Sequence, residues 1–245
     1  MGGNSGLSSR DRFRMIDTLF TQALGLVAPC QVDEVIFKPE SGRIDFQVRF
    51  GAASHFCPAR GATAQPLHDR LAGSWRHLDF FQYEAHLPAE VPRAFCAGGG
   101  KVTQIPVSWA REGSRFTWLF EALTRMLAPM MSVLAAGRRR RVRRRRLWRV
   151  IDHHVRQARA RESHAAVCAI GVDEAASKCG QTYIAVFYDL DAQRLLFATP
   201  GWDKATREKF ASDLTEHGGQ PTAITPVSMD MSGSFQPGGA ELFPG

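Results

Sequence analysis

Apolar positions along the first fifty residues predict a short helix followed by a β-hairpin. Residues 12–26 have helical spacing, whereas residues 33–38 and 43–50 flank a Pro-Glu-Ser-Gly turn at 39–42. Every second residue of the segment 43–50 is apolar, which is the pattern of a half-buried strand. This part of the chain therefore predicts a scaffold and indicates no chemistry.

The segment 110–160 has the apolar spacing of three helices. Residues 116–127 predict the first helix, with Ser114 as the expected N-cap. Residues 130–136 predict a short second helix that stops at Gly137. A third helix is expected to run through residues at helical spacing, namely Leu147, Val150, Ile151, His154 and Val155. This order is the outline of a helix-turn-helix, although other three-helix bundles can imitate it.

The basic charge of the chain lies almost entirely in this helical segment. Between Lys101 and Ala165, sixteen Lys and Arg residues stand against four acids, a net charge of +12 within a total of +7, so the rest sums to −5. Clustered arginines suit the phosphates of DNA, and the alternative is a solvated charged face. The candidate DNA-contacting residues are Arg138, Arg139, Arg140, Arg141, Arg143, Arg144, Arg145, Arg146 and Arg149. Trp148, which lies among them, is expected in the core rather than against DNA bases.

The last third of the chain predicts three strands, a helix and a fourth strand. The strands are expected at residues 167–172, 183–188, 195–199 and 222–229, and the helix at 204–216. A helical crossover of this length lays the fourth strand parallel to the first, because such connections are short and right-handed. This order of elements is the opening of an RNase H-like fold.

Two aspartates directly follow the two strands that are expected to be parallel. Asp173 follows the apolar run 167–172, and Asp230, 57 residues later, follows the fourth strand. Both would lie at the carboxyl ends of neighbouring strands, where two close carboxylates repel each other unless divalent cations lie between them. The alternative is that they are unrelated acids at strand ends.

Two cysteine motifs resemble halves of a zinc knuckle. Cys57 begins Cys-Pro-Ala-Arg-Gly and Cys96 begins Cys-Ala-Gly-Gly-Gly, but Arg60 and Gly99 stand where the second thiolate of each pair is expected. Two cysteines do not complete a tetrahedral zinc site. An eroded zinc-ribbon fold with free thiols is therefore favoured over bound Zn²⁺.

The sequence contains no apolar run near the roughly 20 residues that a membrane helix needs. The first residues also lack the apolar core of a secretory signal. These patterns predict no membrane partner and a cytoplasmic location.

Six stretches form a collinear set of motifs: WRHLDF (75–80), LPAEVPRAFC (87–96), VSWAREGSRFTWLFE (107–121), RLWRVIDHHV (146–155), IGVDEAASKCGQTYIAVFYDLD (170–191) and VSMDMSGSF (227–235). They cover nearly the whole chain. In this order they resemble the ISL-three family of bacterial insertion-sequence transposases.

The resemblance implies an α+β, multidomain protein. Its parts would be a zinc-ribbon-like β domain with partly lost ligands at 1–105, a helix-turn-helix DNA-binding region at 106–163, and an incomplete RNase H-like catalytic domain of the Asp-Asp-Glu (DDE) type at 164–245. Asp173 and Asp230 match the first two catalytic carboxylates of the family. They would bind Mg²⁺ or Mn²⁺.

The implied activity is metal-dependent phosphoryl transfer on DNA, in which the ends of an insertion sequence are cleaved and joined to a target. The implied partner is double-stranded DNA at the terminal repeats, in the bacterial nucleoid, and a homo-oligomer is left open. The third carboxylate of the family is expected beyond Gly245, and Glu241 is not expected to replace it. The chain is therefore interpreted as a truncated transposase that is inactive alone, because the third carboxylate is missing. The alternative is a non-catalytic DNA-binding fragment that occupies transposon ends.

Overall fold

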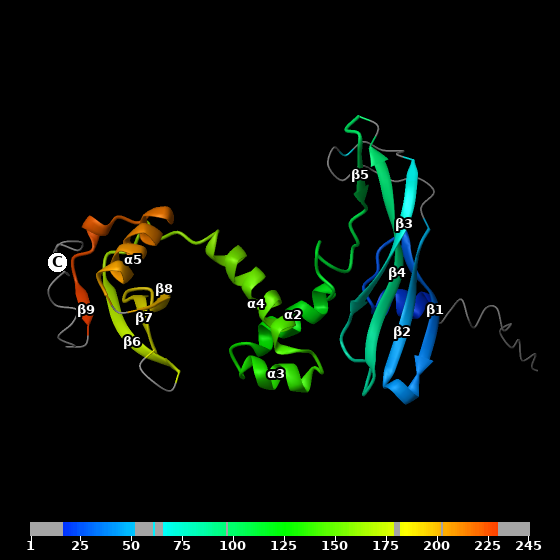
Figure 1. Ribbon diagram of the computed structural model, residues 1–245, viewed down its shortest axis with the longest axis horizontal. Helices are drawn as coiled ribbons and strands as arrows, with labels where there is room; N and C mark the ends of the chain where they lie inside the picture. The colour runs from blue at the N-terminus through cyan, green and yellow to red at the C-terminus, as the bar shows by residue number, and fades with distance from the viewer. Residues whose placement is uncertain are drawn as a thin grey trace, which may run out of the picture. The chain divides into compact units, whose positions relative to one another are not determined.

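The computed structural model describes residues 17–51, 61, 66–96, 98–178, 182–201 and 203–229. The chain divides into two compact units, Met1–Ile151 and Asp152–Gly245, and each contains a β-sheet of its own (Figure 1). Helix α4, Arg144–Arg159, contains the point of division. Within the described ranges, no helix is long and apolar enough to span a membrane.

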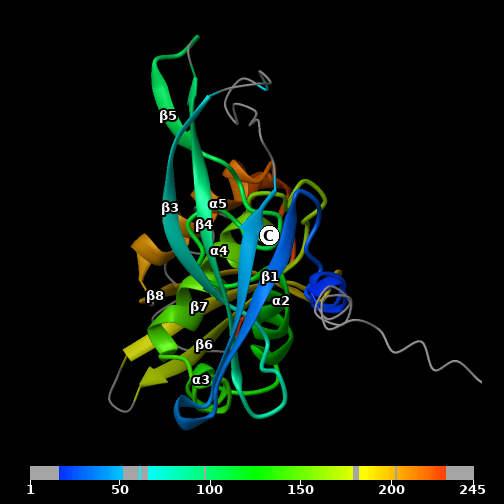
Figure 2. The ribbon, with the colours of Figure 1, turned by 90° about the vertical axis from the view of Figure 1, so that its right-hand side faces the viewer.

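The first unit is built on a five-stranded sheet. Its strands are β1 (Cys30–Lys38), β2 (Arg43–Phe50), β3 (Leu67–Arg76), β4 (Glu84–Cys96) and β5 (Lys101–Gln104). Their order is β1-β2-β4-β3, with β5 paired to β4, and Figure 2 shows the long strand β4 between β2 and β3. The β2–β4 pair is parallel and the other pairs are antiparallel.

The predicted hairpin is confirmed. Strands β1 and β2 pair up to Lys38 and Arg43, and Gly42 adopts a left-handed φ of 61° at the turn between them. Of the helix predicted at 12–26, the described part is helical at residues 17–23. A continuous apolar core covers this sheet, in which Trp75 and Trp109 meet edge to face with ring centroids 5.5 Å apart.

Three helices follow the sheet, as predicted, but their boundaries differ. They are α2 (Trp118–Leu127), α3 (Val133–Arg139) and α4 (Arg144–Arg159). Gly137 lies inside α3 and does not end it, so the prediction of a stop at this glycine is wrong. A second apolar cluster joins these helices, and its members include Phe120, Leu147 and Val150.

The predicted cap of the first of these helices is also wrong. The N-cap is Thr117, whose side-chain oxygen accepts a hydrogen bond from the Phe120 amide. The Ser114 hydroxyl instead donates to the buried carboxylate of Glu121 at 2.6 Å. That carboxylate also accepts from Arg111 at 3.0 Å, so this buried polar group determines where Ser114 points.

The apolar stripe predicted for this helix is only partly buried. Leu119 and Met126 are 47% and 58% exposed, whereas Glu121 and Thr124 are buried. The buried face of α2 is therefore rotated from the one that the apolar spacing indicates. The reason is the Arg111–Glu121 ion pair, which holds a charged side chain of α2 inside the unit.

The second unit contains a four-stranded sheet and one helix. The elements are β6 (Ile170–Lys178), β7 (Thr182–Asp189), β8 (Arg194–Pro200), α5 (Lys204–Glu216), the 3₁₀ turn η2 (Pro221–Ala223) and β9 (Val227–Met229). The strand order is β8-β7-β6-β9. Strand β9 is parallel to β6 and the other pairs are antiparallel, as the crossover rule predicts.

The helix of this unit has the predicted bounds, but the last strand does not. Asp203 caps α5 through a reciprocal capping box with Thr206. Much of the segment predicted as a strand at 222–229 is η2 and irregular chain, because Pro221 cannot donate to a sheet and starts a tight turn. Phe187 and Phe210 stack in the core with ring centroids 4.1 Å apart.

Candidate functional site

The turn between α3 and α4 carries the densest basic charge of the chain. Ser132 caps α3 through the Ala135 amide. The Val142 amide donates to the Gly137 carbonyl at 2.9 Å, and a Cβ at Gly137 would lie 2.8 Å from the Val142 carbonyl oxygen. Glycine is therefore needed at 137 because the chain returns against α3 at this point.

Two arginines of this turn are bound to acids of the same unit. The Arg140 Nη1 atom lies 3.2 Å from an Asp79 carboxylate oxygen. Arg141 donates to the Gln82 carbonyl at 2.9 Å and lies 3.4 Å from carboxylate oxygens of both Asp79 and Glu84. These contacts tie the α3–α4 turn to residues 79–84, which connect β3 to the start of β4.

A third arginine completes the network around Asp79. Arg76 is buried, pairs with Asp79, and lies 3.6 Å from Glu84. The guanidinium groups of Arg76 and Arg140 lie over the Phe120 ring, at 5.6 and 5.5 Å from its centroid. Burial lowers the pKa of Arg140, and this desolvation makes the Asp79 carboxylate necessary as its partner.

The other seven candidate arginines are exposed: Arg138, Arg139, Arg143, Arg144, Arg145, Arg146 and Arg149. Arg146 differs from the rest because its guanidinium lies 4.5 Å from the Phe116 ring centroid. Nothing in the sequence separates this exposed set from Arg140 and Arg141, since their acidic partners lie about sixty residues earlier in the chain.

Trp148 was expected in the core, and this expectation is wrong. Its side chain is 53% exposed, whereas Leu147 and Val150 are buried. Two apolar residues on the inner face of α4 are enough to fix that helix to α2 and α3, so the neighbouring position 148 faces solvent.

Asp173 lies on β6, the central strand beside β9. Its side chain is exposed, and its Oδ1 atom accepts a hydrogen bond from the Glu174 amide at 2.7 Å. The strand continues to Lys178, so the prediction that it ends at Asp173 is wrong. The reason is that β7 pairs with β6 beyond this point, for example through Glu174 and Ala185.

The register of the two parallel strands relates the positions of both candidate carboxylates. Val172 pairs with Met229, and these two residues directly precede Asp173 and Asp230 in the sequence. Asp230 itself lies outside the described residues.

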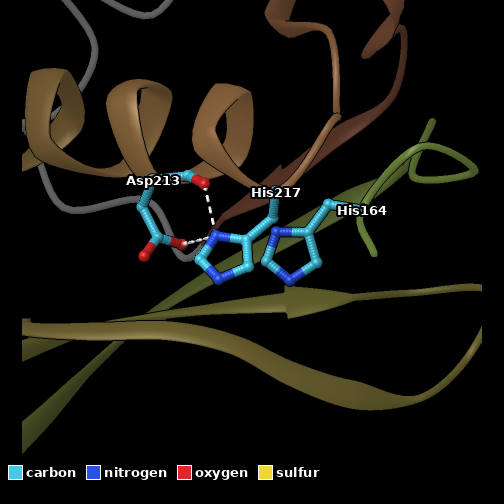
Figure 3. A group of neighbouring side chains, drawn as sticks. All are labelled: His164, Asp213 and His217. Atoms are coloured by element: carbon cyan, nitrogen blue, oxygen red, sulfur yellow. Dashed lines mark hydrogen bonds and ion pairs between the residues drawn. The ribbon is translucent and has the colours of Figure 1, made fainter. Parts of the chain in front are cut away.

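Among the residues that the structure describes, one group of three side chains has the composition of a metal site. His164, Asp213 and His217 place potential ligand atoms within 4.8 Å of one another (Figure 3). The two imidazole rings lie side by side with centroids 4.8 Å apart. His164 is fully buried, and this desolvation, with His217 nearby, lowers its pKa.

The contacts of this group do not fit a metal ion. Both carboxylate oxygens of Asp213 accept from Arg159, at 2.6 and 2.7 Å. The His217 ring nitrogens lie 2.7 Å from the Asp213 carbonyl oxygen and 3.1 Å from that of Arg159. Since a guanidinium already neutralises the carboxylate, we interpret the group as a junction that holds the end of α4 to α5.

Only one cysteine of the predicted zinc motifs can be located. Cys96 is buried at the end of β4 as a free thiol, and Cys57 lies outside the described residues. Cys30 and Cys168 are also free, and burial raises the pKa of Cys30 to about 11. The expectation that Cys57 and Cys96 are free thiols rather than zinc ligands thus stays a prediction.

Comparisons with known proteins match this chain to transposases. The family model of the ISL3-type DDE domain, described as "Transposase", matches residues 170–245. Two curated relatives, each named "Transposase for insertion sequence element IS1557", come from the Mycobacterium tuberculosis strains CDC 1551 / Oshkosh and ATCC 25618 / H37Rv. No solved structure matches the chain.

Each relative is 32% identical over 224 residues, which cover 86% of this chain and 49% of the relative. The class of proteins to which the chain is related is therefore the transposases. More particularly, the chain belongs to the ISL3 family of DDE transposases. It spans about half the length of the curated relatives that it matches.

Proposed function

We propose that this chain takes part in the transposition of an insertion sequence, by cleaving DNA at the ends of the element and transferring the freed strand. The observation that carries this proposal is the pairing of Val172 with Met229 on parallel strands. Asp173 and Asp230 each follow one of these paired residues. In an RNase H-like sheet, two carboxylates at such positions would hold catalytic metal ions between them.

The donor chemistry of the site fits a hard divalent cation. The Asp173 carboxylate is exposed, and carboxylate oxygens are the ligands that Mg²⁺ and Mn²⁺ prefer. When bound, such ions activate a water or hydroxyl nucleophile and stabilise the leaving oxygen in a phosphodiester displacement. Asp173 and Asp230 would hold the ions, and the amide of Glu174 orients the Asp173 side chain through its hydrogen bond.

We further propose that α3 and α4 act as a helix-turn-helix, with α4 in the major groove. The support is the exposed set of arginines at the start of α4, where such motifs contact bases and phosphates. Arg140 and Arg141 would contribute less to binding than the exposed set, because they already pair with Asp79 and Glu84. Their role would be to hold the turn in position.

A strand-cleavage assay tests the catalytic part. The purified chain is incubated with Mg²⁺ and a duplex that carries a terminal repeat of the element. Cleavage that disappears in Asp173→Asn and Asp230→Asn but persists in Glu208→Gln, which changes an exposed acid on α5, would support the catalytic proposal. Binding of Mn²⁺, followed by electron paramagnetic resonance, should weaken in the same two variants.

The same assay separates the alternative function. A chain that binds the terminal-repeat duplex and Mn²⁺ without cutting would act as a DNA-binding fragment that occupies transposon ends. Cleavage that survives Asp173→Asn would reject the assignment of this carboxylate.

A further inference from the structure

We propose that Trp148 reads a thymine in the major groove, by contact of its indole with the thymine methyl group. This inference rests on the proposed role of α4 as the DNA-contacting helix. It assigns to Trp148 a part in sequence discrimination, and to the surrounding arginines the affinity for phosphates.

The position of Trp148 on α4 supports this assignment. It is the fifth residue of the helix, one turn after Arg144, and its side chain is 53% exposed. Leu147 and Val150 occupy the inner face of the helix, so Trp148 points away from the core that they form. Residues in the first turns of a recognition helix are the ones that reach base edges.

The charges around Trp148 favour DNA as the partner of this side chain over an apolar protein surface. Arg144 and Arg145 lie four and three residues before Trp148, and Arg149 follows it, and all three are exposed. An aromatic group surrounded by cations matches a groove lined by phosphates, whereas an apolar protein surface would leave these arginines desolvated without partners. Phosphate contacts by the arginines would set the register of the helix, and a base contact by Trp148 would supply specificity.

The chemistry of the indole defines the base that it contacts. The major groove exposes the C5-methyl group only at thymine, and apolar side chains discriminate thymine through this methyl. The indole ring can cover the thymine methyl group while the neighbouring arginines contact the phosphates of the DNA backbone. We therefore expect the contact to be lost when thymine is replaced by uracil, which differs only by that methyl.

The other tryptophans of this unit show that exposure at 148 is particular to that position. Trp75 and Trp109 are buried against each other in the sheet core. Trp118 is also exposed, at 47%, but it begins α2 and not α4. Trp118→Ala is therefore a matched control, since it removes an equally exposed indole from outside the proposed recognition helix.

The experiment begins with duplexes selected by the full chain from a pool with a random central region. The selected duplex is then compared with copies in which single thymines are replaced by uracil. The wild-type chain should lose affinity on the order of three- to tenfold at one thymine position, at the lower end of single-base discrimination. Trp148→Ala should bind the thymine and uracil duplexes equally, with an unchanged dependence on salt, and Trp118→Ala should keep the wild-type preference.

A Trp148→Ala variant that keeps the thymine preference would overturn the inference. The inference would also be overturned if Trp148→Ala changed only the oligomeric state of the chain. That result would place Trp148 against another copy of the chain. The proposed DNA-binding role is judged separately with Arg144→Ala/Arg145→Ala. If that double variant binds duplex as tightly as the wild type, the proposed function of α4 fails; if it binds weakly while Trp148→Ala stays specific, only the thymine contact fails.

Discussion

Arg140 and Arg141 follow the last turn of α3, and Arg144 and Arg145 begin α4 only three residues later. The first pair contacts Asp79, Gln82 and Glu84, while the second pair faces solvent. One stretch of arginines thus contains two environments. The comparison teaches that charge density along a chain does not distinguish the residues that stabilise a turn from those available to a ligand.

The physical reason is the cost of desolvation. A buried guanidinium needs a close carboxylate, because the charge loses its hydration and the remaining attraction must replace it. Arg140 and Arg76 share Asp79 in this way, and both also lie over Phe120. An exposed arginine stays hydrated, so it does not need a carboxylate partner and its guanidinium remains available to bind phosphates.

The largest effect that separates the two pairs is expected from Asp79→Ala. This change leaves Arg76 and Arg140 without their shared partner and should lower the free energy of unfolding by about 4 kcal/mol. Urea denaturation measures the loss. Asp33→Ala, which removes the exposed partner of Arg49 in the same unit, should change stability far less. Equal losses in both variants would show that the network around Asp79 is not buried in solution.

A second test uses the buried histidine beside this network. Burial, with Arg76 nearby, lowers the pKa of His77 to about 4. Between pH 6.5 and 4 the unfolded chain takes up a proton at this residue that the folded chain does not, so stability falls as the pH falls. At pH 4 the free energy of unfolding should be lower by about 3 kcal/mol because of this residue.

Denaturation across this pH range checks the expectation. His77→Asn should make the fall in stability between pH 6.5 and 4 smaller, by the part that His77 contributes. His68→Asn, at a half-exposed position, should leave that fall unchanged. Parallel curves for the wild type and His77→Asn between pH 6.5 and 4 would contradict the assignment.

The exposed pair is tested by DNA affinity. Arg144→Ala/Arg145→Ala should weaken binding to any duplex roughly tenfold at low salt and reduce the slope of log affinity against log salt by about 2. Fluorescence anisotropy at several salt concentrations measures both quantities. Arg141→Ala should leave the slope nearly unchanged, since its charge is already paired. A similar change of slope in Arg141→Ala would remove the distinction between the two pairs.

The smallest effect is expected at the other end of α4. Arg156 pairs with Asp152 one turn earlier, and both side chains are largely exposed. Such surface pairs contribute little, so Arg156→Ala should leave the midpoint of urea denaturation unchanged within error. A clear shift of that midpoint would indicate that the pair is buried by a contact in solution.

Much of the fold could be predicted because its signals are local. The alternation at 43–50 gave the hairpin, and the spacing at 204–216 gave α5 with its observed bounds. The parallel placement of β9 beside β6 also followed from the sequence, since a single crossover helix allows few arrangements. The candidate carboxylate Asp173 was found in the same way, from an acid after an apolar run.

Other features depended on contacts between distant residues. The cap at Thr117 and the rotated face of α2 follow from the buried Arg111–Glu121 pair, which no local pattern reveals. The length of β6 depended on its pairing with β7 beyond Asp173.

The sequence by itself determined the charge of the helical segment and the order of strands and helices in the second unit. It also showed that Asp173 and Asp230 each follow an apolar run. Only the tertiary structure decided that Arg140 and Arg141 pair with acids of the same unit and that Trp148 is exposed. The physical reason is that solvent exposure and ion pairing depend on what folds against a residue. Asp79 and Glu84 lie some sixty residues from the turn in sequence and within 3.4 Å of it in space.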